Sequence, residues 1–223
     1  MRPTMSNVLQ RSSAGSILAA VQLDPTPATK VLEVMSSSAF EVIVCLAVLR
    51  LCAICIARCY NARTRAVLSL ASWLIIIQGS QRLQGIVQSS KEVLSPVWYA
   101  TLRKPVWNPP PWVFPVVWIP LKVMQVFSAS RLWARLEYRT ATAPAIILFV
   151  LHLALGDVWN RQFFIKQRLL TGLLVIGCFW IVLTASALLF AATSAFSAAL
   201  LVPSIVWVAI ASALNLDVWW LNR

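Results

Sequence analysis

Long apolar runs separated by short charged clusters dominate the pattern along this chain. Each run is about as long as a bilayer core is thick, which predicts membrane-spanning helices. The expected helices cover residues 66–88, 112–133, 144–164, 169–192 and 198–220. The run 169–192 carries no charged residue and is the clearest of them. The pattern therefore predicts an all-α membrane protein, a five-transmembrane-helix bundle.

The N-terminal part leaves room for one extra hydrophobic helix. Residues 39–57 are long enough to cross a membrane, but Glu41 and Arg50 make insertion costly, so an extra span and an interfacial helix both stay open. Residues 1–38 are rich in Ser, Thr, Ala and Pro, as in a transit peptide or a disordered leader. The predicted organisation is a leader (1–38), an extra hydrophobic helix with a basic flank (39–65) and a five-helix domain (66–223).

Composition supports lipid as the main solvent of this protein. Hydrophobic residues make up 60% of the chain, and the mean hydropathy is +0.78. The net charge of +12 comes from Lys and Arg beside apolar runs, which suits phosphate headgroups better than a nucleic acid. We expect an integral membrane protein with lipids as partners. The leader favours a plastid or mitochondrial membrane, with an ER or secretory membrane as the alternative.

Four of the five cysteines lie close together between Cys45 and Cys59. Cys45, Cys52 and Cys59 are seven residues apart and Cys55 lies between them, so the four thiols are expected on one helix face. Metal sites usually take ligands from several elements and include His, whereas thiols inside an apolar helix pack as small hydrophobic groups. Packing is the preferred interpretation, and no metal site is expected.

Two segments with many rare residues carry a resemblance to a known family. Residues 98–105 (WYATLRKP) and 107–118 (WNPPPWVFPVVW) resemble the first loop and the start of the second helix of the TspO/MBR family, also known as translocator proteins or peripheral benzodiazepine receptors. Near the end, Pro203, Trp207 and Trp219 are similar to the family's fifth helix. The resemblance covers about 66–223, so the chain looks like a divergent member with an N-terminal extension.

The resemblance implies a membrane binder or transporter of tetrapyrroles such as porphyrin or haem, or of sterol-like ligands, with no required cofactor. It implies a pocket near the first loop, because Trp and Tyr offer flat stacking surfaces with polar tips. The ligand-binding residues carried over from the family are Trp98, Tyr99, Trp107, Phe114, Trp118, Trp159, Phe163 and Asn215. Each of the aromatic residues among them could instead anchor a helix at the membrane interface.

The third predicted helix departs from the family pattern. Gly156 stands where the family usually has Asn, His152 where Gln is common, and Asn160 and Arg161 where Pro is frequent. His152 is a candidate axial ligand for a haem or chlorophyll-type metal, although a hydrogen bond to another helix is the favoured interpretation. Asp157 is a candidate polar pocket residue, and it lies four residues before Arg161, with which it could pair.

Two other functions compete with ligand binding. A structural subunit of a larger organellar membrane complex, photosynthetic or respiratory, would explain the extra N-terminal helix, and a homodimer is also open. In the fifth helix Ser204 stands where the family tends to have Tyr, which lowers the sterol interpretation relative to the tetrapyrrole one. Porphyrin degradation has no constellation of acid, base, nucleophile and metal ligands behind it, so no enzyme is expected.

Overall fold

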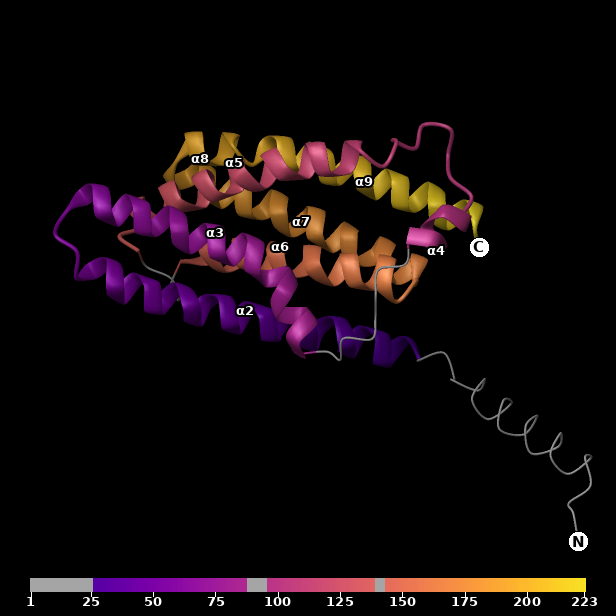
Figure 1. Ribbon diagram of the computed structural model, residues 1–223, viewed down its shortest axis with the longest axis horizontal. Helices are drawn as coiled ribbons and strands as arrows, with labels where there is room; N and C mark the ends of the chain where they lie inside the picture. Colours follow the sequence, from indigo (N-terminus) through magenta and orange to yellow (C-terminus); the bar gives the residue numbers. More distant parts are fainter. Residues whose placement is uncertain (1–25, 88–95, 139–142) are drawn as a thin grey trace, which may run out of the picture. The chain divides into compact units, whose positions relative to one another are not determined.

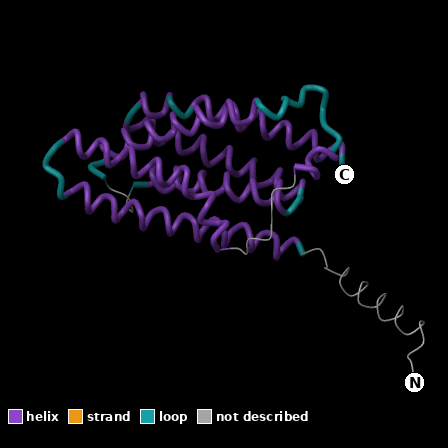
Figure 2. Tube along the Cα trace, viewed as in Figure 1, coloured by secondary structure: helices purple, strands orange, loops and turns teal. Residues whose placement is uncertain are grey.

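The computed structural model describes residues 26–87, 96–138 and 143–223, with the side chains of 80–97 left out. Within these ranges every element is a helix, as Figure 2 shows. The elements, labelled in Figure 1, are α2 (Pro27–Ala57), α3 (Ala62–Val87), α4 (Pro96–Thr101), α5 (Val113–Arg135), α6 (Pro144–Asn160), the π-helical turn η1 (Arg161–Ile165), α7 (Leu169–Thr193), α8 (Ala195–Ala199) and α9 (Val202–Leu221).

Several of these helices are suited to lipid. Three helices, α2, α5 and α7, and the stretch Ala195–Leu221 are long and apolar enough to cross a membrane. Large apolar side chains on their outer surfaces are exposed, for example Ile43, Ile119 and Leu188. In water such surfaces would be unfavourable, whereas lipid tails solvate them. The prediction of an all-α membrane bundle is confirmed.

The extra N-terminal helix, α2, forms and packs against the bundle. It begins at Pro27, so the end of the predicted leader is helical, while residues 1–25 of that leader lie outside the described residues. Its buried positions Ser38, Glu41, Cys45, Leu49 and Ile56 are three, four or seven residues apart and form one stripe. Arg50 lies on the exposed side. The length and apolar character of α2 favour a membrane span over an interfacial helix.

The cysteine prediction is correct in part. Cys45 is buried in a hydrophobic cluster, and Cys52 packs against that cluster, so these thiols act as small core groups. Cys55, however, is exposed, and therefore the four thiols do not share one face. The reason is the offset of three residues from Cys52, which turns Cys55 away from the packing stripe. All five cysteines are free thiols.

Two hydrophobic clusters hold the described helices together. The first joins α2, α3, α5, α6 and α7 around Trp73, which meets Trp133 and Phe149 edge to face at 6.0 and 5.4 Å between ring centroids. The second joins α6, η1, α7 and α9 and includes Trp159, Phe163 and Phe179. Figure 1 shows α7 running beside both α6 and α9. This second cluster supports the candidate site.

Two predicted helices differ in detail from the structure. The third ends as an α-helix at Asn160 and continues for one π-helical turn, in which Lys166 donates its N–H to the Arg161 carbonyl at 2.8 Å. The fifth is divided, because Ser194 caps the short α8 by accepting the N–H of Ser197, and α9 then starts at Val202. A π turn adds a residue to a helical turn and so changes the directions of the side chains within it, here Phe163 and Phe164.

Candidate functional site

Six of the eight predicted ligand-binding side chains come together in one place. They line a small cavity of about 20 Å³ between the first loop, α5, η1 and α9; these are Tyr99, Phe114, Trp118, Trp159, Phe163 and Asn215. The rings point inward, as expected, but they pack against one another. Trp159 and Phe163 are stacked with centroids 6.1 Å apart. A space of this size holds about one water molecule, so the cluster is closed in this conformation.

Trp159 is fixed by α9. Its Nε1 donates to Oδ1 of Asn215 at 3.1 Å, and the Asn215 amide nitrogen donates to the Ala211 carbonyl at 2.8 Å within α9. Asn215 is 4% exposed and both ends of its amide are engaged. In this structure Asn215 positions Trp159, and one N–H and one lone pair of its amide are used for these two hydrogen bonds.

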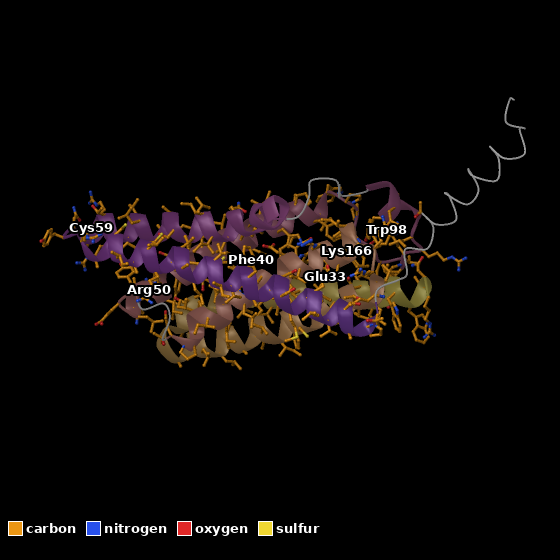
Figure 3. All side chains as sticks on the ribbon, turned by 90° about the horizontal axis from the view of Figure 1, so that it is seen from below. Glu33, Phe40, Arg50, Cys59, Trp98 and Lys166 are labelled. Carbon is orange, nitrogen blue, oxygen red and sulfur yellow. The ribbon has the colours of Figure 1, made fainter. Side chains whose placement is uncertain are left out.

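The other two predicted residues lie outside this cavity. Trp98 of α4 packs edge to face on Phe163, with ring centroids 5.8 Å apart, so it contacts the aromatic cluster without lining the cavity. Trp107 is 46% exposed and donates from Nε1 to Oδ2 of Asp217 at 2.9 Å. Neither residue lines either of the cavities described for this site. Figure 3 shows Trp98 toward the same end of the helices as Lys166, far from Cys59.

Several contacts fix the first loop at the end of α9. Asn222 accepts the N–H of Arg103 at 3.0 Å and donates to the Arg103 carbonyl at 2.8 Å. The Tyr99 hydroxyl donates to Oδ1 of Asn108 at 3.1 Å. Burial raises the pKa of Tyr99, so this hydroxyl keeps its proton. The loop is thus attached to α9 at two points, at Asn222 and at Asp217.

A larger cavity of about 320 Å³ lies next to the aromatic cluster, between α3, α5, α6 and α7. Trp118 and Trp159 line both cavities and separate them. Its other walls are Ile77, Gln78, Ile119, Lys122, Gln125, His152, Leu153, Gly156, Asp157, Asn160 and Phe179. Gln78 and Ile119 are the exposed members of this lining, so the cavity opens between α3 and α5. The resemblance had placed the opening near the first loop.

The cavity contains charged groups at membrane depth. Lys122 lies in the middle of α5 and is close enough to Asp157 of α6 for their charges to interact. The ammonium group of Lys122 has no hydrogen bond to any described residue, whereas Gln125, one turn further, donates to Ser204 Oγ at 3.1 Å. Ionisable groups inside a membrane are costly and usually mark a functional site.

The expected pairing of Asp157 with Arg161 is not formed. Arg161 is the first residue of η1 and is buried, and its Nε has no hydrogen-bond partner among the described residues. The backbone between the two residues is still α-helical, because the N–H of Arg161 donates to the Asp157 carbonyl, so the directions of the two side chains keep the charged groups apart. Asp157 instead lies near Lys122 of α5.

His152 is buried beside the same cavity. Its imidazole is 1% exposed, stacks on Phe179 at 5.9 Å and tilts against Phe149 at 4.4 Å between ring centroids. Neither ring nitrogen has a hydrogen-bond partner; the Phe149 carbonyl is close but outside hydrogen-bond geometry. The expected hydrogen bond to another helix is therefore absent. A ligand in the cavity would supply what these nitrogens lack.

Comparison with known proteins agrees with this arrangement. Residues 71–221 match the sequence profile described as the TspO/MBR family, which is more than half of the chain. The chain belongs to the TspO/MBR family. It is 34% identical to Protein CrtK of Rhodobacter capsulatus, over 58% of this chain and 82% of that protein. It is 37% identical to the tryptophan-rich protein TspO of Chlorobaculum tepidum and 33% to the human translocator protein, over 79% and 73% of their lengths.

The substituted positions now have structural reasons in this TspO/MBR protein. A Cβ at Gly156 would lie 3.3 Å from Cζ of Phe179, so glycine lets the ring close against α6. Ser204, where the family tends to have Tyr, receives the hydrogen bond of Gln125. Asn160 donates to the Gly156 carbonyl at 3.1 Å within α6. Two of these three residues, Gly156 and Asn160, line the larger cavity.

Sequence reasoning missed Lys122, Gln125 and Phe179. For Lys122 a signal was present, because it is the one charged residue between Trp112 and Ser130, and such isolation inside an apolar run points to a functional group. Gln125 and Phe179 gave no comparable signal. Amides and phenylalanines are found on many faces of membrane helices, and only packing shows which of them face a cavity.

Proposed function

We propose that this membrane protein binds a flat hydrophobic ligand that carries a carboxylate, a tetrapyrrole of the porphyrin or haem type, without chemically changing it. The ligand occupies the 320 Å³ cavity between α3, α5, α6 and α7. The observation that carries the proposal is Lys122, an ammonium group in an aromatic cavity that makes no hydrogen bond to any described residue.

The chemistry of the lining supports a tetrapyrrole over a sterol. Trp118, Trp159 and Phe179 provide ring surfaces on which a macrocycle can stack. Lys122 provides a positive charge for a propionate, and a carboxylate placed between Lys122 and the unbonded nitrogens of His152 would engage both. A sterol carries no acid and would offer Lys122 no negative charge beyond that of Asp157. The charge therefore favours the acidic ligand.

The size of the cavity limits how such a ligand binds. Pockets for small molecules usually have volumes of about 300–1,000 Å³, and 320 Å³ is at the lower end of this range. A whole macrocycle needs more room, so its propionate edge enters and the opposite edge projects between Gln78 and Ile119 toward lipid. Movement of the Trp118 or Trp159 ring would join the two cavities and admit more of the ligand.

Fluorescence titration tests the proposal directly. Protoporphyrin IX added to the purified protein in mild detergent is expected to quench tryptophan emission, because two of its eleven tryptophans line the cavity. Changing Trp118 and Trp159 together to Phe should remove most of this quenching. No saturable quenching with the unaltered protein would rule out tetrapyrrole binding, and unchanged quenching in the double variant would place the ligand elsewhere.

A pair of ligands tests the role of Lys122. Lys122→Met should lower the affinity for protoporphyrin IX about tenfold, the effect of losing one charge-assisted hydrogen bond. The dimethyl ester of protoporphyrin has the same ring and no acid, so it serves as the matched control and should bind both proteins equally. Equal losses for acid and ester would mean that Lys122 supports only the shape of the cavity.

A further inference from the structure

A second groove, independent of the proposed ligand cavity, lies at the opposite end of the bundle. It is formed by the first half of α3, the last half of α5 and α8, and its volume is about 550 Å³. Its walls change in character along its length. Arg131, Arg135 and Tyr138 lie at one end, whereas Leu70 and Phe127 lie at the other.

The position of the groove is set by helix ends. Arg135 is the last residue of α5 and Ala62 the first of α3, so both mark the membrane surface at this end. Phe127 lies eight residues before Arg135 on α5, and Leu70 eight residues after Ala62 on α3. At a rise of 1.5 Å per residue the groove therefore reaches roughly 12 Å into the membrane. This depth covers the headgroup boundary and the first part of the acyl chains.

Hydrogen bonds and small side chains form the floor. Ser130 of α5 donates to Ser69 Oγ of α3 at 2.8 Å, which keeps the two helices close at this depth. Space above this contact is left by the small side chains of Ala62, Ala66 and Ala134. Phe127 and Phe196, 53% and 59% exposed, form the raised sides. The groove therefore has apolar walls, and a hydrocarbon chain can lie between them.

The charge at the surface end is positive and available. The Arg131 guanidinium lies 5.1 Å from the centre of the Phe196 ring, a cation–π contact that holds it over the groove. Neither Arg131 nor Arg135 has an ion pair or a hydrogen bond from its side chain to another described residue. Arg58 follows α2, and Arg63 and Arg65 lie in the first turn of α3, whose Ala62 and Ala66 line the groove. No acidic side chain is among the described residues that line the groove.

We propose that this groove is a binding site for one anionic glycerophospholipid, with the phosphate between Arg131 and Arg135 and an acyl chain against Leu70 and Phe127. The polarity of the groove matches an amphiphile that carries its negative charge at the membrane surface. Guanidinium groups suit phosphate because they donate paired hydrogen bonds. A free phosphate ion would bind the arginines but leave the apolar part of the groove empty. A lipid fills both parts and is therefore the better occupant.

Native mass spectrometry of the full chain in mild detergent measures this binding. We expect phosphatidylglycerol to bind at least tenfold more tightly than phosphatidylcholine with the same acyl chains. Changing Arg131 and Arg135 together to Gln should weaken phosphatidylglycerol binding about 25-fold, since each basic side chain beside an anionic headgroup contributes about fivefold. Equal affinity of the unaltered protein for the two lipids would overturn the proposal.

Matched variants separate the groove from general surface charge. Arg58 and Arg63 are exposed at the same end and do not line the groove, so changing both to Gln removes the same charge and should leave the lipid preference intact. An equal loss in the two double variants would overturn the proposal. Phe127→Ala should weaken phosphatidylglycerol binding severalfold while keeping the headgroup preference. If binding is unchanged, the apolar part of the groove does not hold the acyl chain.

A soluble competitor distinguishes lipid from free anion. Glycerol phosphate carries the same phosphate without acyl chains, and it should fail to displace phosphatidylglycerol at a hundredfold excess. Displacement would show a simple anion site and contradict the lipid assignment. Size-exclusion elution and thermal unfolding of each variant confirm that it is folded, and salt titration of the unaltered protein gives a second measurement, because the phosphatidylglycerol preference should fall as salt screens the arginines.

Discussion

The indole of Trp159 on α6 is held by Asn215 on α9 through a hydrogen bond of 3.1 Å. These residues are far apart in the sequence, and both were expected to contact the ligand directly. The bond adds a structural role for each of them to that prediction. Trp159 separates the two cavities, and Asn215 determines where its ring stands.

Removal of the hydrogen bond between Trp159 and Asn215 should change the orientation of the Trp159 ring more than the stability of the fold. Asn215→Leu leaves the buried Nε1 of Trp159 without an acceptor, which costs about 1 kcal/mol of stability in a membrane bundle. Porphyrin affinity should also fall severalfold as the ring loses its orientation. Thermal unfolding and fluorescence titration measure the two effects. Ser212→Ala on the same helix is the control, because its hydroxyl bonds only within α9.

Gly156 should tolerate a side chain poorly. A methyl group there would meet Cζ of Phe179 at 3.3 Å, whereas nothing lies within 4 Å of a Cβ at Gly177. We expect Gly156→Ala to be less stable than Gly177→Ala by about 1 kcal/mol, because overpacking offsets any gain in helix propensity. Thermal unfolding of the two variants in one detergent checks this. Equal stability would show that Phe179 moves aside at no cost.

The extra N-terminal helix should contribute to stability through one side only. Leu49 is fully buried in the first hydrophobic cluster, and Leu51, two residues later, is 64% exposed. Leu49→Ala should therefore lower stability by about 2–3 kcal/mol, and Leu51→Ala should have little effect. Chemical or thermal unfolding measures both. If the two variants unfold alike, α2 is not packed on the bundle as described.

The contact between Trp107 and Asp217 offers a test of whether ligands pass the first loop. Asp217→Asn weakens a charge-assisted hydrogen bond of 2.9 Å at the loop. If ligands pass this loop, porphyrin release should speed up severalfold while binding at equilibrium changes less. If they enter between α3 and α5, the release rate stays the same. Stopped-flow fluorescence distinguishes the two routes, and the second outcome is the one that the position of the 320 Å³ cavity predicts.

The fold was largely readable from the sequence because lipid imposes a simple rule. Apolar runs of spanning length must be helices, so their number and approximate bounds followed from hydropathy. What hydropathy could not give were local departures from regular helix, such as the π turn at Arg161 and the short α8 capped by Ser194. These depend on hydrogen bonds that leave no periodic pattern. The start of α2 at Pro27 was missed because its first turns have a mixed composition.

The site was readable only in part. Motif matching brought together the aromatic residues that line the small cavity, since rare residues in a long match keep their places. The motif match could not show that these rings pack against one another and leave only a small cavity. Nor could it show that the larger cavity lies beside them. That volume depends on small changes, a missing side chain at Gly156 and a lysine at position 122, whose effect is visible only when neighbouring helices are in place.

The mouth of the larger cavity between Gln78 and Ile119 has a consequence for how occupancy is controlled. On the proposed function, a ligand reaches this mouth from the hydrocarbon phase and not from water. Its concentration in the bilayer therefore decides how full the site is, and strongly partitioning compounds gain an advantage unrelated to their fit. Affinities measured in different detergents or lipid mixtures should be compared only after partitioning into each phase has been taken into account.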